Sequence, residues 1–141
     1  MDLDNLKRTN DTFGHEWGDR YIHEAAVCFL RNIPDGTLCA RVSGDEFNIL
    51  FCGYDSREAV QHAIDRLVSG VENSHFNLPD GQATRIHVSG GIAWYPEDGT
   101  ELMELIKCAD FAMYQMKRNE KGRFGMFDRT QYNQTEGDMS R

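Results

Sequence analysis

The sequence predicts an α+β fold in which helices pack on a largely antiparallel sheet. Two strand-like runs, residues 38–42 and 46–52, are separated by only three residues, which is typical of an antiparallel hairpin. Segments with helical spacing of apolar residues alternate with the strand-like runs, as crossover helices do. Hairpins mixed with crossover helices favour a mixed α/β sandwich of one sheet and its helices.

The first predicted helix covers residues 17–30. Apolar side chains recur on one face of this segment at every fourth position: Trp17, Tyr21, Ala25 and Phe29. This spacing predicts that Trp17 and Tyr21 are core residues. The proline and glycine of residues 33–36 end the helix in a turn.

Helices and strands continue to alternate after the hairpin. Asp55 and Glu58 form a predicted capping box before the next helix. Residues 85–95 predict a strand with a glycine pair in its middle, and Thr100 is predicted to cap the helix that follows. Residues 123–127 predict a last short strand, so the domain is expected to end near residue 128.

The two ends of the chain differ from this pattern. The expected element order is β-α-β-β-α-β-α-β, if a truncated first strand ends at Asp2. Residues 129–141 are polar and aperiodic, and we expect them to form a loosely ordered tail. The predicted organisation is therefore one domain, residues 1–128, followed by the tail.

Composition excludes some classes of function. The formal net charge of −8 over 141 residues argues against a surface that coats nucleic acid. No apolar stretch approaches the roughly 18 residues of a membrane span, and no signal peptide opens the chain. These features predict a cytoplasmic domain without direct membrane contact.

Acidic residues occur at two points where a strand-like run meets a turn. At the end of a strand that turns, the side chain of Asp2 and the carbonyl of Leu3 can converge while Asp4 diverges. If that strand pairs beside the hairpin, Asp2 and Asp45 meet at one edge of the sheet. Carboxylates packed that closely repel unless a cation lies between them, and oxygen ligands of this kind suit Mg²⁺.

The acids of these two clusters have two other interpretations. The acids can be ordinary solvated turn residues, which holds for most matches to such a short pattern. An EF-hand calcium loop starting at Asp2 is excluded, because Phe13 stands where the closing glutamate belongs.

Four segments together are similar to the GGDEF domain, the diguanylate cyclase family. They are DLDNLKRTNDTFGHEWGD, RVSGDEF, VSGGIAWYPEDG and ADFAMYQMKRNEKGR, in the order and spacing of that family, and the resemblance covers residues 2–128. It implies a palm-like, ferredoxin-type fold with a central, mostly antiparallel sheet flanked by helices, as in nucleotidyl cyclases. It also implies a homodimer in which two GTP molecules condense into cyclic di-GMP with loss of pyrophosphate.

The resemblance implies a set of site residues. The implied catalytic residues are Asp2, Asp45 and Glu46. The implied ligands of Mg²⁺, or of Mn²⁺, are Asp2, the carbonyl of Leu3, Asp45 and Glu46. The implied GTP-binding residues are Lys7, Asn10, Asp19, Ser43, Gly44, Lys117 and Arg123.

Within this set, an amide at Asn10 and a carboxylate at Asp19 suit the hydrogen-bonding edge of guanine. Without the resemblance, Asn10 would be read as a helix cap and Asp19 as a solvated acid. Lys121 competes with Arg123 for the phosphate, because the segment that holds both is two residues longer than the common pattern.

The chain also departs from the family. Ser43 stands where the first glycine of the signature is usual, and its Cβ and hydroxyl crowd the approach of a nucleotide. Residues 34–37 lack the arginine of the family's inhibitory RxxD motif, so product inhibition by that route is not expected.

The leading hypothesis is an active cyclase domain coupled to an upstream sensor, either free in the cytoplasm or as the cytoplasmic part of a membrane-anchored protein. The alternative is a catalytically silent module that binds GTP or dimerises within a larger signalling protein.

Overall fold

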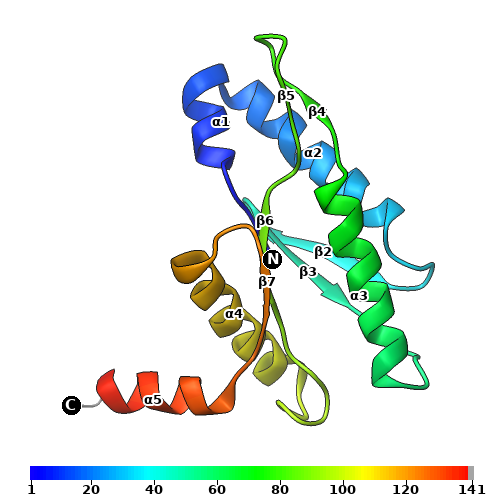
Figure 1. The fold of residues 1–141 in the computed structure, drawn as a ribbon, viewed down its shortest axis with the longest axis vertical. Helices are drawn as coiled ribbons and strands as arrows, with labels where there is room; N and C mark the ends of the chain where they lie inside the picture. The colour runs from blue at the N-terminus through cyan, green and yellow to red at the C-terminus, as the bar shows by residue number, and fades with distance from the viewer. Residues whose placement is uncertain (140–141) are drawn as a thin grey trace. The chain divides into compact units, whose positions relative to one another are not determined.

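A computed structural model describes residues 1–139 of the chain (Figure 1). Residues Asp2–Val88 form one compact unit, and Met1 together with Ser89 onward forms the other. Each unit combines strands with helices, and three of the four strand pairs whose register is resolved are antiparallel. The predicted α+β class with a mostly antiparallel sheet is confirmed.

Three strands form the sheet of the first unit. Strand β3 (Glu46–Leu50) pairs antiparallel with β2 (Leu38–Ser43) on one side and with the two-residue strand β1 (Asp2–Leu3) on the other. The predicted hairpin is therefore confirmed. Its register shifts between Arg41 and Ser43, where a β-bulge bends the strand that leads into the turn.

The first unit also contains three helices, which are α1 (Leu6–Phe13), α2 (His15–Arg31) and α3 (Arg57–Glu72). Helix α2 carries the predicted apolar face. Phe29 of this face meets Phe47 of β3 edge-to-face, with ring centroids 5.2 Å apart. Helix α2 also contacts α3, beside it in Figure 1. The short hairpin of β4 (Phe76–Asn77) and β5 (Ala83–Thr84) was not predicted.

The second unit is built around a parallel pair. Strand β6 (Val88–Ile92), which starts at the last residue of the first unit, pairs with β7 (Phe124–Met126). The two are connected through α4 (Leu102–Asn119), which packs on β7. The predicted strand of residues 85–95 is thus shorter than expected.

Both predicted helix caps are wrong. The N-cap of α3 is Ser56, whose Oγ accepts a hydrogen bond from the Ala59 amide at 3.1 Å, so the capping box at Asp55 and Glu58 does not form. Helix α4 has its N-cap at Glu101 without a side-chain cap, and the Thr100 amide donates to the Glu104 carboxylate instead. The chain offers several capping residues in a row at each start, and local pattern does not decide among them.

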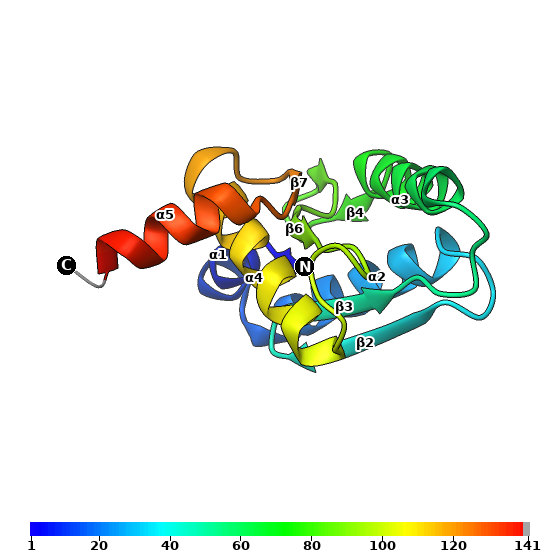
Figure 2. The ribbon, with the colours of Figure 1, turned by 90° about the horizontal axis from the view of Figure 1, so that it is seen from below.

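The expectation of a loosely ordered tail is wrong for the residues that the structure describes. Residues Arg129–Met139 form helix α5, whose first turn lies against α4 in Figure 2. Tyr132 packs edge-to-face on Phe111 of α4 with centroids 5.0 Å apart, and Arg129 donates to the carbonyl of Asp98 at 2.9 Å. These contacts are distant in sequence, so polarity alone did not reveal them. Residues 140–141 of the predicted tail lie outside the described residues.

Candidate functional site

The end of β1 lies directly against the turn of the β2–β3 hairpin. Asp2 is opposite Glu46 in the antiparallel register, and the Leu3 amide donates to the carbonyl of Asp45 at 2.8 Å. With that bond between the flanking residues, Asp2 and Glu46 form a non-hydrogen-bonded pair, in which facing side chains come closest. The structure therefore brings Asp2, Leu3, Asp45 and Glu46 to one place.

Two carboxylates facing each other on one side of a sheet are electrostatically unfavourable. Asp2 and Glu46 are in this arrangement, and each is only half-buried. A cation between the two side chains would be shared by both carboxylates. The donor set, which is oxygen only, fits a hard divalent ion such as Mg²⁺.

Within residues 1–139, no group of three or more His, Cys, Asp or Glu side chains is arranged to hold a metal ion. The acids of the β1–β3 site therefore do not form a closed cage. Mg²⁺ usually takes one or two protein carboxylates and completes its shell with water and substrate phosphates.

The hairpin turn is open to solvent. Ser43 and Gly44 are exposed, and Gly44 has a φ of 23°, a left-handed conformation that favours glycine. The Arg41 side chain donates to the Gly44 carbonyl at 2.9 Å and braces the turn from the strand before it. The turn thus presents backbone and small side chains next to the acids.

Two residues, Asp4 and Asn5, connect β1 to α1. Asn5 has a φ of 69° and serves as N-cap of α1, but its side chain makes no capping hydrogen bond. The first amides of α1 can therefore take an anionic ligand. Lys7 is exposed in this first turn, adjacent to the acids in sequence and on the same helix as Asn10.

Asn10 and Asp19 lie at the corner between α1 and α2. Gly14, with a φ of 95°, makes the corner, and its amide donates to the Asn10 carbonyl at 2.8 Å. The Asn10 side chain lies over Gly18, so closely that a Cβ atom at Gly18 would overlap the Asn10 amide oxygen. Because Gly18 has no side chain, the Asn10 amide can lie against the backbone directly before Asp19.

Asp19 also lines a groove of 580 Å³ on the first unit. The groove runs along one face of α2 and over β4, with Trp17 and Phe76 as its aromatic walls. Arg20 stacks on the Trp17 ring, 4.7 Å from the ring centroid. Asp19 is exposed at this surface and accessible to a ligand.

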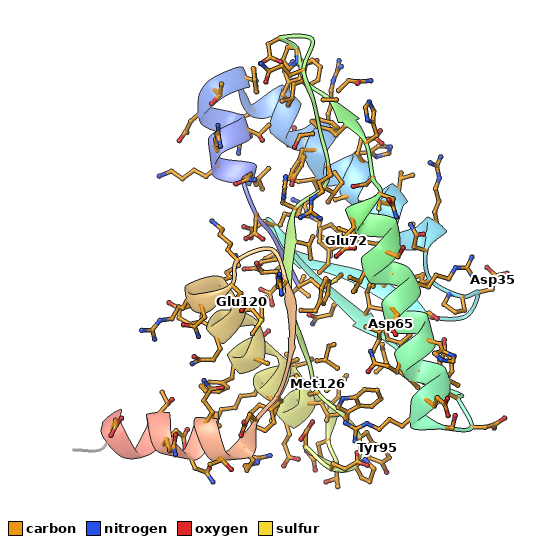
Figure 3. All side chains as sticks on the ribbon, in the orientation of Figure 1. Asp35, Asp65, Glu72, Tyr95, Glu120 and Met126 are labelled. Carbon is orange, nitrogen blue, oxygen red and sulfur yellow. The ribbon has the colours of Figure 1, made fainter. Side chains whose placement is uncertain are left out.

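The remaining predicted cations belong to the second unit. Lys117 is half-buried in the last turn of α4, and Lys121 is exposed in the turn that follows. Arg123 is exposed and pairs with Glu120 at 3.3 Å; Figure 3 labels Glu120 at the end of α4. An exposed pair of this kind is weak, so a phosphate can replace Glu120 as the partner of Arg123.

The family profile described as "Diguanylate cyclase, GGDEF domain" matches residues 1–123. This chain belongs to the GGDEF domain family. In the part of the chain that the structure describes, no helix has the length and apolar character needed to cross a bilayer.

This GGDEF domain is similar to regions of much longer proteins. It is 31% identical over 130 residues to the probable diguanylate cyclase DgcE of Escherichia coli, covering 91% of this chain and 11% of that protein. It is 33% identical over 131 residues to the cyclic di-GMP phosphodiesterase PdeR of the same organism, covering 90% of this chain and 19% of that protein. The chain thus spans less than a third of the curated relatives it matches.

Solved structures give the same result for the fold. The crystal structure of the GGDEF domain of TpbB (YfiN) from Pseudomonas aeruginosa has a TM-score of 0.81 and 30% sequence identity. The match covers 90% of this chain and 78% of that chain. The α+β arrangement of this GGDEF domain is therefore that of its family.

Three residues next to the site were not predicted to bear on it. They are Arg41, Gly18 and Tyr21. Tyr21 is buried, as predicted, but its hydroxyl group also contacts the backbone at the end of β1. The sequence offers one signal for Tyr21: a tyrosine at a predicted core position carries a hydroxyl group that needs a hydrogen-bond partner.

Proposed function

We propose that this GGDEF domain is the catalytic domain of a diguanylate cyclase that uses a divalent metal ion and acts as a homodimer. The 3′-oxygen of each GTP attacks the α-phosphorus of the other, and the bond from that phosphorus to pyrophosphate breaks. The single observation that supports the proposal most is the register of Asp2 opposite Glu46, with Leu3 hydrogen-bonded to Asp45. The catalytic domain is proposed to span residues 1–128.

Asp2, Asp45 and Glu46 are the proposed catalytic acids, and with the Leu3 carbonyl they are the proposed metal ligands. Mg²⁺ or Mn²⁺, when bound, neutralises charge on the triphosphate and makes the attacking hydroxyl more acidic. The protein groups hold the triphosphate and the attacking oxygen in line. In phosphoryl transfer, positioning of the reactants and electrostatic stabilisation usually account for most of the rate enhancement.

Base recognition is assigned to the corner between α1 and α2. The Asn10 amide can donate to O6 and accept from the base edge, and the Asp19 carboxylate accepts from N1–H and the exocyclic amine of guanine. Adenine presents the opposite donor pattern at these positions. The proposed specificity for GTP over ATP follows from that mismatch.

The phosphates are assigned to backbone and cations. The uncapped first turn of α1, with Lys7 on it, supports anion binding near the acids. Ser43 and Gly44, which are exposed in the hairpin turn, are proposed to contact the nucleotide. Lys117 and Arg123 are the further proposed phosphate contacts, with Lys121 as the alternative to Arg123.

An upstream sensor and a cytoplasmic location complete the proposal. The similarity to short regions of long signalling proteins supports a domain that works as part of a larger chain. No contact with nucleic acid is proposed, given the net charge of −8.

A second candidate function is a silent regulatory module that binds GTP without making product. Two observations favour it. Ser43 replaces a glycine of the signature, and PdeR, which is similar over 90% of this chain, is named a phosphodiesterase rather than a cyclase. Membership of the family therefore does not decide between the two.

The test is incubation of the purified chain with GTP and Mg²⁺, with cyclic di-GMP measured by mass spectrometry. The wild-type chain is expected to make product, and Asp45→Ala to lose at least about a hundredfold in rate. Asp35→Ala is the matched control, since Asp35 is an exposed acid in the loop after α2 (Figure 3). Product that persists undiminished in Asp45→Ala would contradict the role of Asp45. Binding of GTP without product, even after Ser43→Gly, would favour the regulatory module.

A further inference from the structure

The hydroxyl group of Tyr21 closes a ring of hydrogen bonds between two separate backbone segments. The Asp4 amide donates to the His87 carbonyl at 2.8 Å. The His87 amide donates to the Tyr21 hydroxyl at 2.9 Å, and that hydroxyl donates to the Asp4 carbonyl at 3.0 Å. Every polar backbone group of Asp4 and His87 is thereby satisfied.

In this ring the Tyr21 hydroxyl takes the place of one backbone hydrogen bond between Asp4 and His87. Two opposing residues in an antiparallel ladder can exchange both N–H···O=C bonds directly. Asp4 and His87 make one of these directly, and the return bond passes through the Tyr21 oxygen. The side chain of Tyr21 thus fixes how far these two backbone segments separate just after β1 ends.

The rest of Tyr21 is held in place by packing. Its side chain is 1% exposed, and its ring meets Phe76 edge-to-face, 5.5 Å between centroids. Burial, with a further contribution from Asp4, raises the pKa of Tyr21 to about 12, although the His87 amide and Arg85 act in the opposite direction. The hydroxyl group therefore keeps its proton and remains a donor at any physiological pH.

The position of Tyr21 links two parts of the proposed site. It is two residues after Asp19 on α2, and the carbonyl that it contacts is one residue after Leu3. The strand that carries the proposed metal ligands and the helix that carries the proposed base-reading acid are thus joined by one hydroxyl group.

We propose that Tyr21 is a positioning residue that sets the end of β1, and with it Asp2 and the Leu3 carbonyl, relative to α2. This inference rests on the proposed function for its consequence in catalysis. The hydrogen bonds of the Tyr21 hydroxyl to His87 and Asp4, called the bridge below, do not depend on that function. The bridge and the catalytic role can therefore be tested separately.

The test substitutes Tyr21→Phe, which removes one oxygen and keeps the ring against Phe76. The His87 amide loses its acceptor, and hydrogen exchange at that amide is expected to be about tenfold faster. The Mg²⁺ concentration for half-maximal cyclic di-GMP synthesis is expected to rise about tenfold, as for other residues that orient metal ligands. The preference for GTP over ITP, which lacks the exocyclic amine, is expected to stay within about twofold, because Asp19 is unchanged.

The matched control is Tyr114→Phe, the same change at an exposed position of α4. It is expected to alter neither exchange at His87 nor the Mg²⁺ dependence. The wild-type chain gives a second measurement that needs no variant: a slowly exchanging hydroxyl proton of Tyr21, with a nuclear Overhauser effect to the His87 amide.

The outcomes separate the two proposals. Unchanged exchange at His87 in Tyr21→Phe, or no such hydroxyl proton, would overturn the bridge. Faster exchange with an unchanged Mg²⁺ dependence would overturn the positioning role and leave Tyr21 as a purely structural residue. A wild-type chain that makes no product, while His87 still responds to the substitution, would reject the proposed function but not the bridge.

Discussion

Helices α2 and α4 are held within their own units by different kinds of contact. Helix α4 lies on β6 at Gly91, where a Cβ atom would overlap the helix backbone at Ala109 and Met113. Backbone atoms inside a helix cannot rotate away from such an overlap. The seating of α4 therefore depends on the absence of one side chain.

Helix α2 is contacted by side chains instead. The Asn10 amide lies over Gly18, and the Tyr21 hydroxyl ties the helix to backbone at the end of β1. A side chain can rotate at modest cost, but here its rotation would move a group assigned to the substrate. The comparison predicts that a change at Gly91, where α4 is contacted through its backbone, acts mainly on stability. A change at Gly18, where α2 is contacted by the Asn10 side chain, is predicted to act mainly on ligand binding.

The strongest test of the α4 side is Gly91→Ala. The added methyl group has only helix backbone to displace, so the free energy of unfolding is expected to fall by about 3 kcal/mol. Urea denaturation followed by circular dichroism measures this change. Gly137→Ala is the control, because Gly137 lies in α5 with no atom near the position of a Cβ, and alanine favours a helix by about 1 kcal/mol. Equal losses in the two variants would contradict the close seating of α4.

The second prediction concerns the pH dependence of stability on the α2 side. The pKa of Tyr21 is raised from 10.0 to about 12 in the folded chain, chiefly by burial, with Asp4, Arg85 and the His87 amide as its polar neighbours. The folded state thus holds this proton more tightly than the unfolded state does. The associated stability is complete below pH 10 and is lost as the pH rises to 12, by up to about 2.7 kcal/mol.

Denaturation of wild-type and Tyr21→Phe chains between pH 9 and 12 measures this loss. The two chains differ only in this hydroxyl group, so the difference between the two curves isolates Tyr21. Parallel curves across the whole range would show that the hydroxyl group ionises as freely in the folded chain as in the unfolded one.

Much of the fold could be predicted, because the periodicity of apolar residues reflects burial directly. The face of α2 that holds Tyr21 and Phe29 is buried as its spacing predicted, and the β2–β3 hairpin lies where two apolar runs flank a short turn. Helix α5 was missed, since its contact with Phe111 joins residues far apart in sequence. A polar helix whose contacts come from residues such as Tyr132 and Arg129 has no apolar periodicity to detect.

The candidate site also has a part that the sequence predicted and a part that it did not. Strand pairing beside the hairpin predicted that Asp2 would lie near Asp45, and the register places it one residue away, opposite Glu46. The functions of these residues came from the family resemblance, and they remain proposals. The supports of the site were not predictable, because Gly18 and Tyr21 act through tertiary contacts that no local pattern encodes.

The third prediction separates ligand binding from stability on α2. In Gly18→Ala the new methyl group displaces the Asn10 amide, which is a flexible group, so the chain is expected to fold with a loss of about 1 kcal/mol. The displaced amide no longer meets the base, and the Kd for GTP is expected to rise at least about tenfold. Calorimetric titration with GTP and Mg²⁺ measures the affinity, and thermal unfolding measures the stability.

Gly70→Ala is the matched control for this variant. Gly70 is also a helical glycine covered by an asparagine side chain, that of Asn32, but it lies in α3, away from the residues assigned to GTP. The two substitutions should therefore cost similar stability, whereas only Gly18→Ala should weaken GTP binding. An equal loss of affinity for GTP in both variants would mean that binding follows general stability. It would contradict the prediction that the Asn10 contact on α2 acts specifically on ligand binding.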